Sequence, residues 1–293
     1  MRGIININKP QNFTSHDCVA IVRRLVGVKR VGHTGTLDPM ATGVLPVCIG
    51  TAARIMDYLD EDSKEYRCRL KLGIDTDTCD IWGKTISTGS TEGITEAQII
   101  AAFAPFSGEI SQIPPKYSAL KVNGKKLYEY ARAGQEVEIK ARTVTIKELE
   151  LEEIKGDEVA FRVVCSKGTY IRSICHDVGA ALGCGAAMSA LSRTASGVFF
   201  IEDAIDLEEL RTMSKEEIIP LILPTDYPLV NFTPVQLSRE EAKNFIDGKH
   251  IVYSGEITGK KYKLYCEETF LGVAKYSEKY KKLVADKVFN TEI

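Results

Sequence analysis

One aspartate stands in a segment that fits neither a regular helix nor a regular strand. Val31–Gly50 contains four glycines, two prolines, one histidine and Asp38. Glycine lets a backbone turn sharply or approach a ligand, and the proline after Asp38 disfavours helical geometry at the aspartate. The Gly-x4-Gly-Lys-Ser/Thr order of a phosphate-binding loop is absent. We therefore expect an irregular loop on which Asp38 either performs chemistry or, in the simpler interpretation, caps a turn.

An arginine stands where a helix tolerates a cation least. Val159–Cys165 is typical of a strand, Ser166–Gly168 of a turn, and Ile171–Leu182 of an amphipathic helix whose first turn contains Arg172. The helix N-terminus carries partial positive charge, so this placement costs roughly a few tenths of a kcal/mol or more unless an anion compensates it. We infer a protein carboxylate or an RNA phosphate beside Arg172, with a solvated surface arginine as the alternative.

A third segment combines cations with aromatic rings. Pro114–Arg142 contains seven cations, three acids and three tyrosines, a net charge of +4. Such interleaving suits a phosphate backbone with unstacked bases, although a solvated face of a helix and loop is the simpler interpretation. Ile201–Glu217, with a net charge of −5, offsets it, and the whole chain carries −2. The total charge is therefore a weak argument against RNA, because a local basic surface remains possible.

Capping and periodicity predict the elements that position these residues. Thr14 and Asp17 have the spacing of a capping box, and Gly27 stands where the helix after them would end. Residues 65–72 alternate between charged and apolar side chains, which predicts a half-buried strand. Tyr66 is the first residue on the apolar face of that strand.

Composition places the chain among ordinary globular proteins of about two domains. It has 293 residues, of which 27% are charged. Eight cysteines form no Cys-x-x-Cys pair and four histidines lack metal-ligand spacing, so we expect reduced buried thiols and no metal site. The first ten residues lack a signal-peptide core, and uncharged stretches are shorter than the roughly 20 residues of a bilayer span. We expect no membrane partner and a cytoplasmic location.

Prolines divide the chain into two predicted domains. Pro224, Pro228 and Pro234 lie between two patterned regions, so we expect a large mixed domain over residues 1–228 and a small one over 229–293. In the small domain, Ser238 and Glu241 predict a capped helix. Four β-like runs follow it: His250–Tyr253, Tyr262–Cys266, Phe270–Lys275 and Lys282–Phe289.

Taken together, the motifs resemble those of the bacterial TruB-type tRNA pseudouridine synthases. The matching segments are Ile7–Gln11 (INKPQ), Gly32–Gly50, Lys64–Arg67 (KEYR), Pro114–Arg142, Gly168–Arg172 (GTYIR) and Leu191–Phe199 (LSRTASGVF). The resemblance implies an α+β pseudouridine-synthase fold, with a central mixed, largely antiparallel sheet and a small C-terminal β-rich PUA-like domain that binds RNA. It also implies isomerisation of the T-loop uridine at tRNA position 55, with residues 114–142 as an RNA-binding insertion.

The resemblance assigns roles to individual residues by position. Catalytic roles fall on Asp38, on Arg172 as its salt-bridge partner and on Tyr66; substrate-binding roles fall on His33, which would enter the T loop, Tyr170, Lys9, Arg54, Lys121 and Leu191. Lys9, Arg54 and Lys121 are expected to contact phosphates or the pocket. No metal or other cofactor is implied, because the reaction breaks C1′–N1 and forms C1′–C5 without redox change.

The mechanism and two other functions stay open at this level. Asp38 could attack the ribose C1′, attack C6 of the base, or remove the C2′ proton to give a glycal, which is the route we favour. Tyr66 could stack on the base or transfer a proton from C5. The expected partner is the T-arm stem-loop of tRNA, bound by a monomer without guide RNA. The alternatives are a guide-dependent synthase of a ribonucleoprotein particle, and an RNA-binding or tRNA-folding protein that would not require Asp38.

Overall fold

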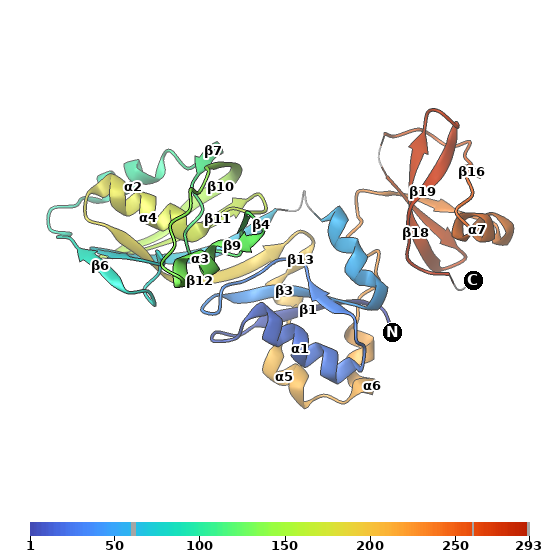
Figure 1. Cartoon of the computed structure of the whole chain (residues 1–293), viewed down its shortest axis with the longest axis horizontal. Helices are drawn as coiled ribbons and strands as arrows, with labels where there is room; N and C mark the ends of the chain where they lie inside the picture. The colour runs from blue at the N-terminus through green and yellow to red at the C-terminus, as the bar shows by residue number, and fades with distance from the viewer. Residues whose placement is uncertain (60–62, 260, 292–293) are drawn as a thin grey trace.

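A computed structural model of the chain describes residues 1–59, 63–259 and 261–291 (Figure 1). A ten-stranded mixed sheet forms the large domain, in the order β14-β1-β3-β12-β4-β11-β10-β7, with β2 beside β3 and β13 beside β12. Its strands are β1 (Gly3–Lys9), β2 (Val31–His33), β3 (Thr42–Ile49), β4 (Lys64–Leu72), β7 (Gly108–Gln112), β10 (Arg142–Lys155), β11 (Glu158–Cys165), β12 (Ala186–Ser196), β13 (Phe199–Phe200) and β14 (Ile205–Asp206). Only the β1–β14 and β3–β12 pairs in this described sheet are parallel, which confirms the predicted mixed, largely antiparallel α+β fold.

Helices cover the sheet in two groups. They comprise α1 (Ser15–Val26), α2 (Glu96–Phe103), α4 (Ile171–Leu182), α5 (Leu207–Thr212) and α6 (Lys215–Ile218), with the 3-10 helices η1 (Gly50–Tyr58), η2 (Ile201–Asp203) and η3 (Ile219–Leu221). Apolar side chains of α2 and α4 pack on β4, β11 and β12, whereas those of α1, α5 and α6 pack on β1 and β3. The site described below lies between these two halves.

Local signals in the sequence account for the elements nearest the site. Thr14 and Asp17 form the predicted capping box of α1, and Gly27 ends the helix in the left-handed conformation with φ 68°. In β4, Tyr66 and the alternate residues after it are buried, as the periodicity predicts. Gly43 is the point where β3 meets β12: a side chain there would lie 2.2 Å from the Arg193 carbonyl oxygen.

The segment between β7 and β10 forms a small separate unit. It contains a hairpin of β8 (Lys121–Val122) and β9 (Lys125–Lys126), followed by α3 (Leu127–Arg132). A second hairpin, β5 (Ile74–Thr76) with β6 (Thr85–Thr88), leaves the end of β4. In the view of Figure 1, α3 and β9 overlie β12 of the large sheet.

The C-terminal part is a five-stranded sheet with one helix, which confirms the predicted β-rich domain. It contains β15 (Thr233–Gln236), α7 (Arg239–Ile246), β16 (Ile251–Val252), β17 (Tyr262–Cys266), β18 (Thr269–Ser277) and β19 (Lys282–Val288), of which β15 was not predicted. Ser238 and Glu241 form the predicted capping box. Leu229 is buried in a cluster that contains Ile4 and Phe289, so the linker packs against both parts. The boundary at residue 228 stays a prediction.

All eight cysteines are free and seven are buried, while Cys79 is half-buried. Among the described residues no helix has the length and apolar character needed to cross a bilayer.

Candidate active site

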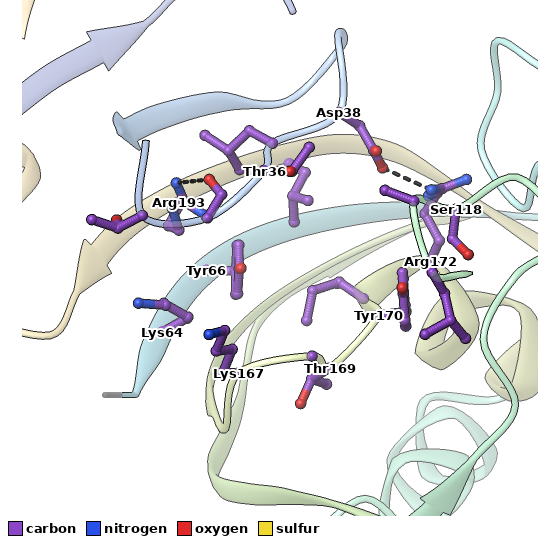
Figure 2. Close-up of a pocket in the computed structure, with 18 residues that line it drawn as sticks. Thr36, Asp38, Lys64, Tyr66, Ser118, Lys167, Thr169, Tyr170, Arg172 and Arg193 are labelled. Atoms are coloured by element: carbon purple, nitrogen blue, oxygen red, sulfur yellow. Dashed lines mark hydrogen bonds and ion pairs between the residues drawn. The ribbon is translucent and has the colours of Figure 1, made fainter. Parts of the chain in front are cut away.

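An ion pair joins the loop before β3 to the first turn of α4. Arg172 Nη2 lies 2.9 Å from Asp38 Oδ2, and the side chains are 6% and 36% exposed respectively. The anion inferred from the position of Arg172 in its helix is therefore a protein carboxylate. Figure 2 shows the pair at the edge of the pocket. Because the carboxylate is far more exposed than the guanidinium, Asp38 can meet a substrate while its partner stays largely within the protein.

Arg172 is fixed by two further segments of the chain. Its Nη1 donates to the Thr78 carbonyl and its Nη2 to the Tyr117 carbonyl, both at 2.9 Å. Thr78 belongs to the turn between β5 and β6, and Tyr117 belongs to the insertion. One buried guanidinium therefore holds the Asp38 loop, that turn and the insertion together.

A second carboxylate, which no pattern in the sequence indicated, completes this network. Asp80 Oδ2 lies 3.7 Å from Arg172 Nη1, with the Asp80 side chain 3% exposed. Burial raises the pKa of Asp80, whereas the Thr78 hydroxyl bonded to it and Arg172 oppose that rise. Asp80 follows a short strand at a tight turn, a position whose ordinary interpretation is a turn cap, and no local signal connects it to Arg172.

The backbone around Asp38 is held from the start of α1. Ser15 Oγ accepts from Leu37 N at 2.9 Å and donates to the Leu37 carbonyl at 3.1 Å. Lys9 is fully buried, and its Nζ donates to the carbonyls of Pro10, Phe13 and Pro39 at 2.9, 2.7 and 3.2 Å. The expected contact of Lys9 with phosphate or the pocket is thus wrong: its amino group is enclosed, and it braces the Asp38–Pro39 loop from behind.

A pocket of about 330 Å³ opens beside the ion pair, at the small end of the roughly 300–1,000 Å³ typical of ligand sites. Five predicted residues line it: Asp38, Tyr66, Tyr170, Arg172 and Leu191. Tyr66 is buried, and this burial raises the pKa of its phenol, so the hydroxyl is protonated at neutral pH. The apolar and aromatic walls can enclose a planar base.

The position of Tyr170 depends on a side chain far away in the sequence. Gln112, at the end of β7, accepts from Tyr170 N at 2.8 Å and donates to the Tyr170 carbonyl at 3.0 Å. Gln112 is buried, so this pair of bonds fixes the backbone at the start of α4. Residues of the insertion, Ser118–Leu120, also line the pocket.

Cations surround the pocket more closely than the sequence analysis predicted. Lys64, Lys167 and Arg193 line it, and in Figure 2 the two lysines lie across Tyr66 from the Asp38–Arg172 pair. Arg193 is buried and donates to the carbonyls of Val44 at 2.7 Å and Gly35 at 3.1 Å. Among the described lining residues the pocket has four cations and one carboxylate, Asp38.

Besides Lys9, three predicted substrate contacts lie outside the pocket lining. Arg54 donates to the Val288 carbonyl at 2.7 Å and its guanidinium lies over the ring of Phe289, so it binds the C-terminal domain. It does not line the pocket, and its expected phosphate contact stays a prediction. Lys121 is exposed on the insertion hairpin, where it can contact a phosphate. His33 lies on β2, one residue before the pocket lining begins, with its ring against His16 at 5.5 Å between centroids.

The cations and tyrosines of the insertion contact one another. Lys125 lies over the ring of Tyr130 at 4.7 Å, and Lys126 and Arg132 both lie over Tyr128 at 5.4 Å. Within the described part of the chain, no three histidine, cysteine, aspartate or glutamate side chains gather as metal ligands. A carboxylate, a fixed guanidinium and aromatic walls make up the pocket described above.

Comparison with known families agrees with this arrangement. A model described as the N-terminal domain of the TruB family pseudouridylate synthases matches residues 23–171. Models described as the tRNA pseudouridylate synthase B C-terminal domain and the C-terminal part of pseudouridine synthase II TruB match residues 172–230 and 233–280. Fold and sequence together define an isomerase. The chain belongs to the TruB family of pseudouridylate synthases, as its motifs predicted.

Relatives that match this chain over nearly its whole length are called tRNA pseudouridine synthase B. Proteins called tRNA pseudouridine synthase B from Alkaliphilus oremlandii and Clostridioides difficile are 45% and 43% identical to this chain, covering 97% and 95% of it and 98% and 95% of their own lengths. Among solved structures, an H/ACA ribonucleoprotein bound to a substrate RNA containing 2′-deoxyuridine and a Cbf5-Nop10-Gar1 complex are similar at TM-scores of 0.72 and 0.73. They are 27% and 28% identical, and each comparison covers 98% of this chain and 85% of the other. These similarities confirm the predicted fold.

Proposed function

We propose that this protein isomerises uridine to pseudouridine at position 55 in the T loop of tRNA. The observation that carries the proposal is the Asp38–Arg172 ion pair, in which a reachable carboxylate borders a pocket with aromatic walls. The Arg172 guanidinium at 2.9 Å supplies a fixed positive charge beside this carboxylate. An ionised carboxylate is what each candidate mechanism requires of Asp38.

The reaction conserves every atom of the uridine. The C1′–N1 bond breaks, the base rotates, C1′ joins C5, the proton on C5 leaves and N1 takes up a proton. Asp38 acts as nucleophile at C1′ or C6, or as the base that removes the C2′ proton to give a glycal, and we favour the glycal route. No electron acceptor takes part, because the product is an isomer of the substrate.

Tyr66 is proposed to stack on the extruded uracil. Extrusion of a base costs roughly a few kcal/mol, and stacking on an aromatic side chain returns about 1–3 kcal/mol. The raised pKa of its phenol favours this role over that of a base, because a protonated phenol cannot accept the C5 proton. Tyr170 and Leu191 complete the walls, and His33 is proposed to fill the space that the uridine leaves in the T loop.

The charges around the pocket support an RNA substrate. The whole chain carries −2, but the described lining residues include four cations and one carboxylate, and the +4 insertion contributes Ser118–Leu120. Phosphates can therefore be bound beside the site even though the total charge is slightly negative. Lys121, exposed on the insertion hairpin, is proposed to contact the phosphates of the T arm.

We further propose that the enzyme acts as a cytoplasmic monomer without a guide RNA. The relatives named tRNA pseudouridine synthase B are 41–45% identical and match nearly end to end. The chains from the H/ACA and Cbf5 complexes are 27–28% identical and extend beyond this one. Higher identity and fuller mutual coverage favour the stand-alone type.

The proposal is tested by incubating the purified protein with an unmodified tRNA transcript, in EDTA and without added guide RNA. Mapping of the product should find pseudouridine at position 55. A matched transcript with cytidine at that position should bind but contain no new pseudouridine. Absence of conversion of the first transcript, with the protein folded and the RNA bound, would contradict the proposed function and favour a binding or tRNA-folding role.

A further inference from the structure

The only tryptophan of the chain lies on the turn between β5 and β6, close to the site in structure and without a role in it. We propose that Trp82 stacks on an unpaired base of the tRNA substrate beside the uridine pocket. This inference rests on the proposed function, because it names a second contact of the same substrate. It assigns to this turn a binding role besides that of holding Arg172.

Trp82 exposes a large apolar surface. Its residue is 43% exposed, and the preceding Ile81 is 40% exposed. A single exposed apolar residue needs no explanation, but an exposed indole beside a second apolar side chain offers a flat surface that water solvates poorly. Every nucleic acid base has a face that can cover such a ring.

The turn that carries the indole is firmly held. Thr76 Oγ1 donates to the Asp80 carbonyl at 2.7 Å, and Trp82 N donates to Asp80 Oδ1 at 3.2 Å. Gly83 N donates to the same carbonyl at 3.1 Å. An aromatic group on a fixed backbone loses less freedom on binding than one on a flexible loop, so its contact yields more affinity.

The same turn is bonded to two elements of the pocket. Thr78 accepts a bond from Arg172 of α4 at 2.9 Å. Ile81 N donates to the Met188 carbonyl of β12 at 2.9 Å, and three residues further along that strand Leu191 lines the pocket. The turn that carries Trp82 is thus bonded to α4 and β12, two elements that line the pocket.

The chemistry nearby favours RNA over a protein partner. Arg172 binds the turn through Thr78 and the basic insertion through Tyr117, so both border one site. A substrate held by the insertion therefore passes beside the turn. The bases of a loop are unpaired and free to stack, and stacking on an aromatic side chain tolerates any base.

Intrinsic fluorescence tests the contact directly, because all indole emission comes from position 82. Titration of the full-length protein with a T-arm stem-loop should quench this emission and protect it from acrylamide, at the RNA concentration that saturates binding. Trp82→Ala should raise Kd and KM by about 5- to 150-fold, with kcat at saturating RNA nearly unchanged. Trp82→Phe should keep most of the affinity.

A matched control is Ile100→Ala, which removes an exposed apolar side chain of α2 and should leave Kd unchanged. Unaltered emission and acrylamide quenching at saturating RNA, or a Trp82→Ala variant with the Kd of the wild type, would overturn the inference. If the wild type still forms pseudouridine in that case, the proposed function stands and only the stacking contact fails. If the wild type neither binds nor converts the RNA, both fail.

Discussion

Arg172 Nη2 and Asp38 Oδ2 lie 2.9 Å apart, and the two side chains differ sharply in exposure, 6% against 36%. The Thr78 and Tyr117 carbonyls and the Asp80 carboxylate surround the guanidinium, whereas the Asp38 carboxylate faces the pocket. The pair therefore separates two tasks: Arg172 holds the carboxylate in position, and Asp38 meets the substrate. Charge alone at position 172 would not suffice, because the same group bonds two backbone carbonyls.

Replacement of Arg172 by lysine tests this geometry. Lysine keeps the charge but cannot make the three contacts of the planar group at once. We expect kcat to fall by about 10- to 150-fold, from the roughly 1.5–3 kcal/mol of one hydrogen bond to a charged group, with little change in RNA affinity. Single-turnover rates and filter binding measure the two effects. A uniform loss of affinity with a salt slope smaller by about one, and normal turnover, would instead mark Arg172 as a phosphate contact.

Asp80→Asn tests the buried carboxylate behind Arg172. The amide keeps the shape of the side chain but removes the charge 3.7 Å from the guanidinium. We expect kcat to fall by about tenfold, because Arg172 loses one of its two carboxylate partners and is held less firmly beside Asp38. Asp77→Asn is the control, since Asp77 accepts from Lys84 N on the same turn at 2.7 Å. Equal activities of the two variants would remove Asp80 from the network.

Lys9→Met tests the structural role that replaces the expected phosphate contact. Three carbonyls lose their shared donor inside the protein, at a cost of about 1–3 kcal/mol per unsatisfied group. Urea unfolding should give a free energy of unfolding lower by at least about 2 kcal/mol. Lys121→Met, on the exposed hairpin, should leave stability unchanged and reduce the salt slope of RNA binding by about one. The reverse pattern would restore the original prediction for Lys9.

Burial of His33 makes the free energy of unfolding decrease at acidic pH. Burial, with the nearby His16 and Arg193, lowers the pKa of His33 from 6.5 to about 4. Between these values the unfolded chain binds more protons than the folded one, so the free energy of unfolding decreases as the pH falls from 6.5 towards 4. Urea unfolding at pH 7 and at pH 5 measures this decrease. Between the two pH values, the free energy of unfolding should fall less for His33→Gln than for the wild type. The exposed His250→Gln should follow the wild type; a His33→Gln variant that does so too would contradict the shift.

What the sequence could predict about this site depended on short-range signals. The proline after Asp38 and the capping box of α1 act within a few residues, and the alternation in β4 placed Tyr66 on the buried face. The odd position of Arg172 in its helix also indicated a nearby anion. Each of these signals comes from backbone geometry or periodicity, which act locally.

The missed contacts join residues far apart in the chain. Asp80 meets Arg172 only because the β5–β6 turn is bonded to β12, and Gln112 fixes Tyr170 across 58 residues. Lys9 and Arg54 were assigned from family motifs to contacts with phosphates or the pocket, yet tertiary packing directs one into the interior and the other to the C-terminal domain. Side-chain type and spacing do not determine which way a long cationic side chain turns.

The central claim is that the Asp38 carboxylate performs the isomerisation, and the Asp38→Asn variant tests it most directly. The variant keeps the size and polarity of the side chain but removes its charge. With a T-arm stem-loop containing uridine at position 55, we expect no pseudouridine, while Kd for the RNA stays within a few-fold of that of the wild type. Conversion by Asp38→Asn at the rate of the wild-type enzyme would contradict the claim.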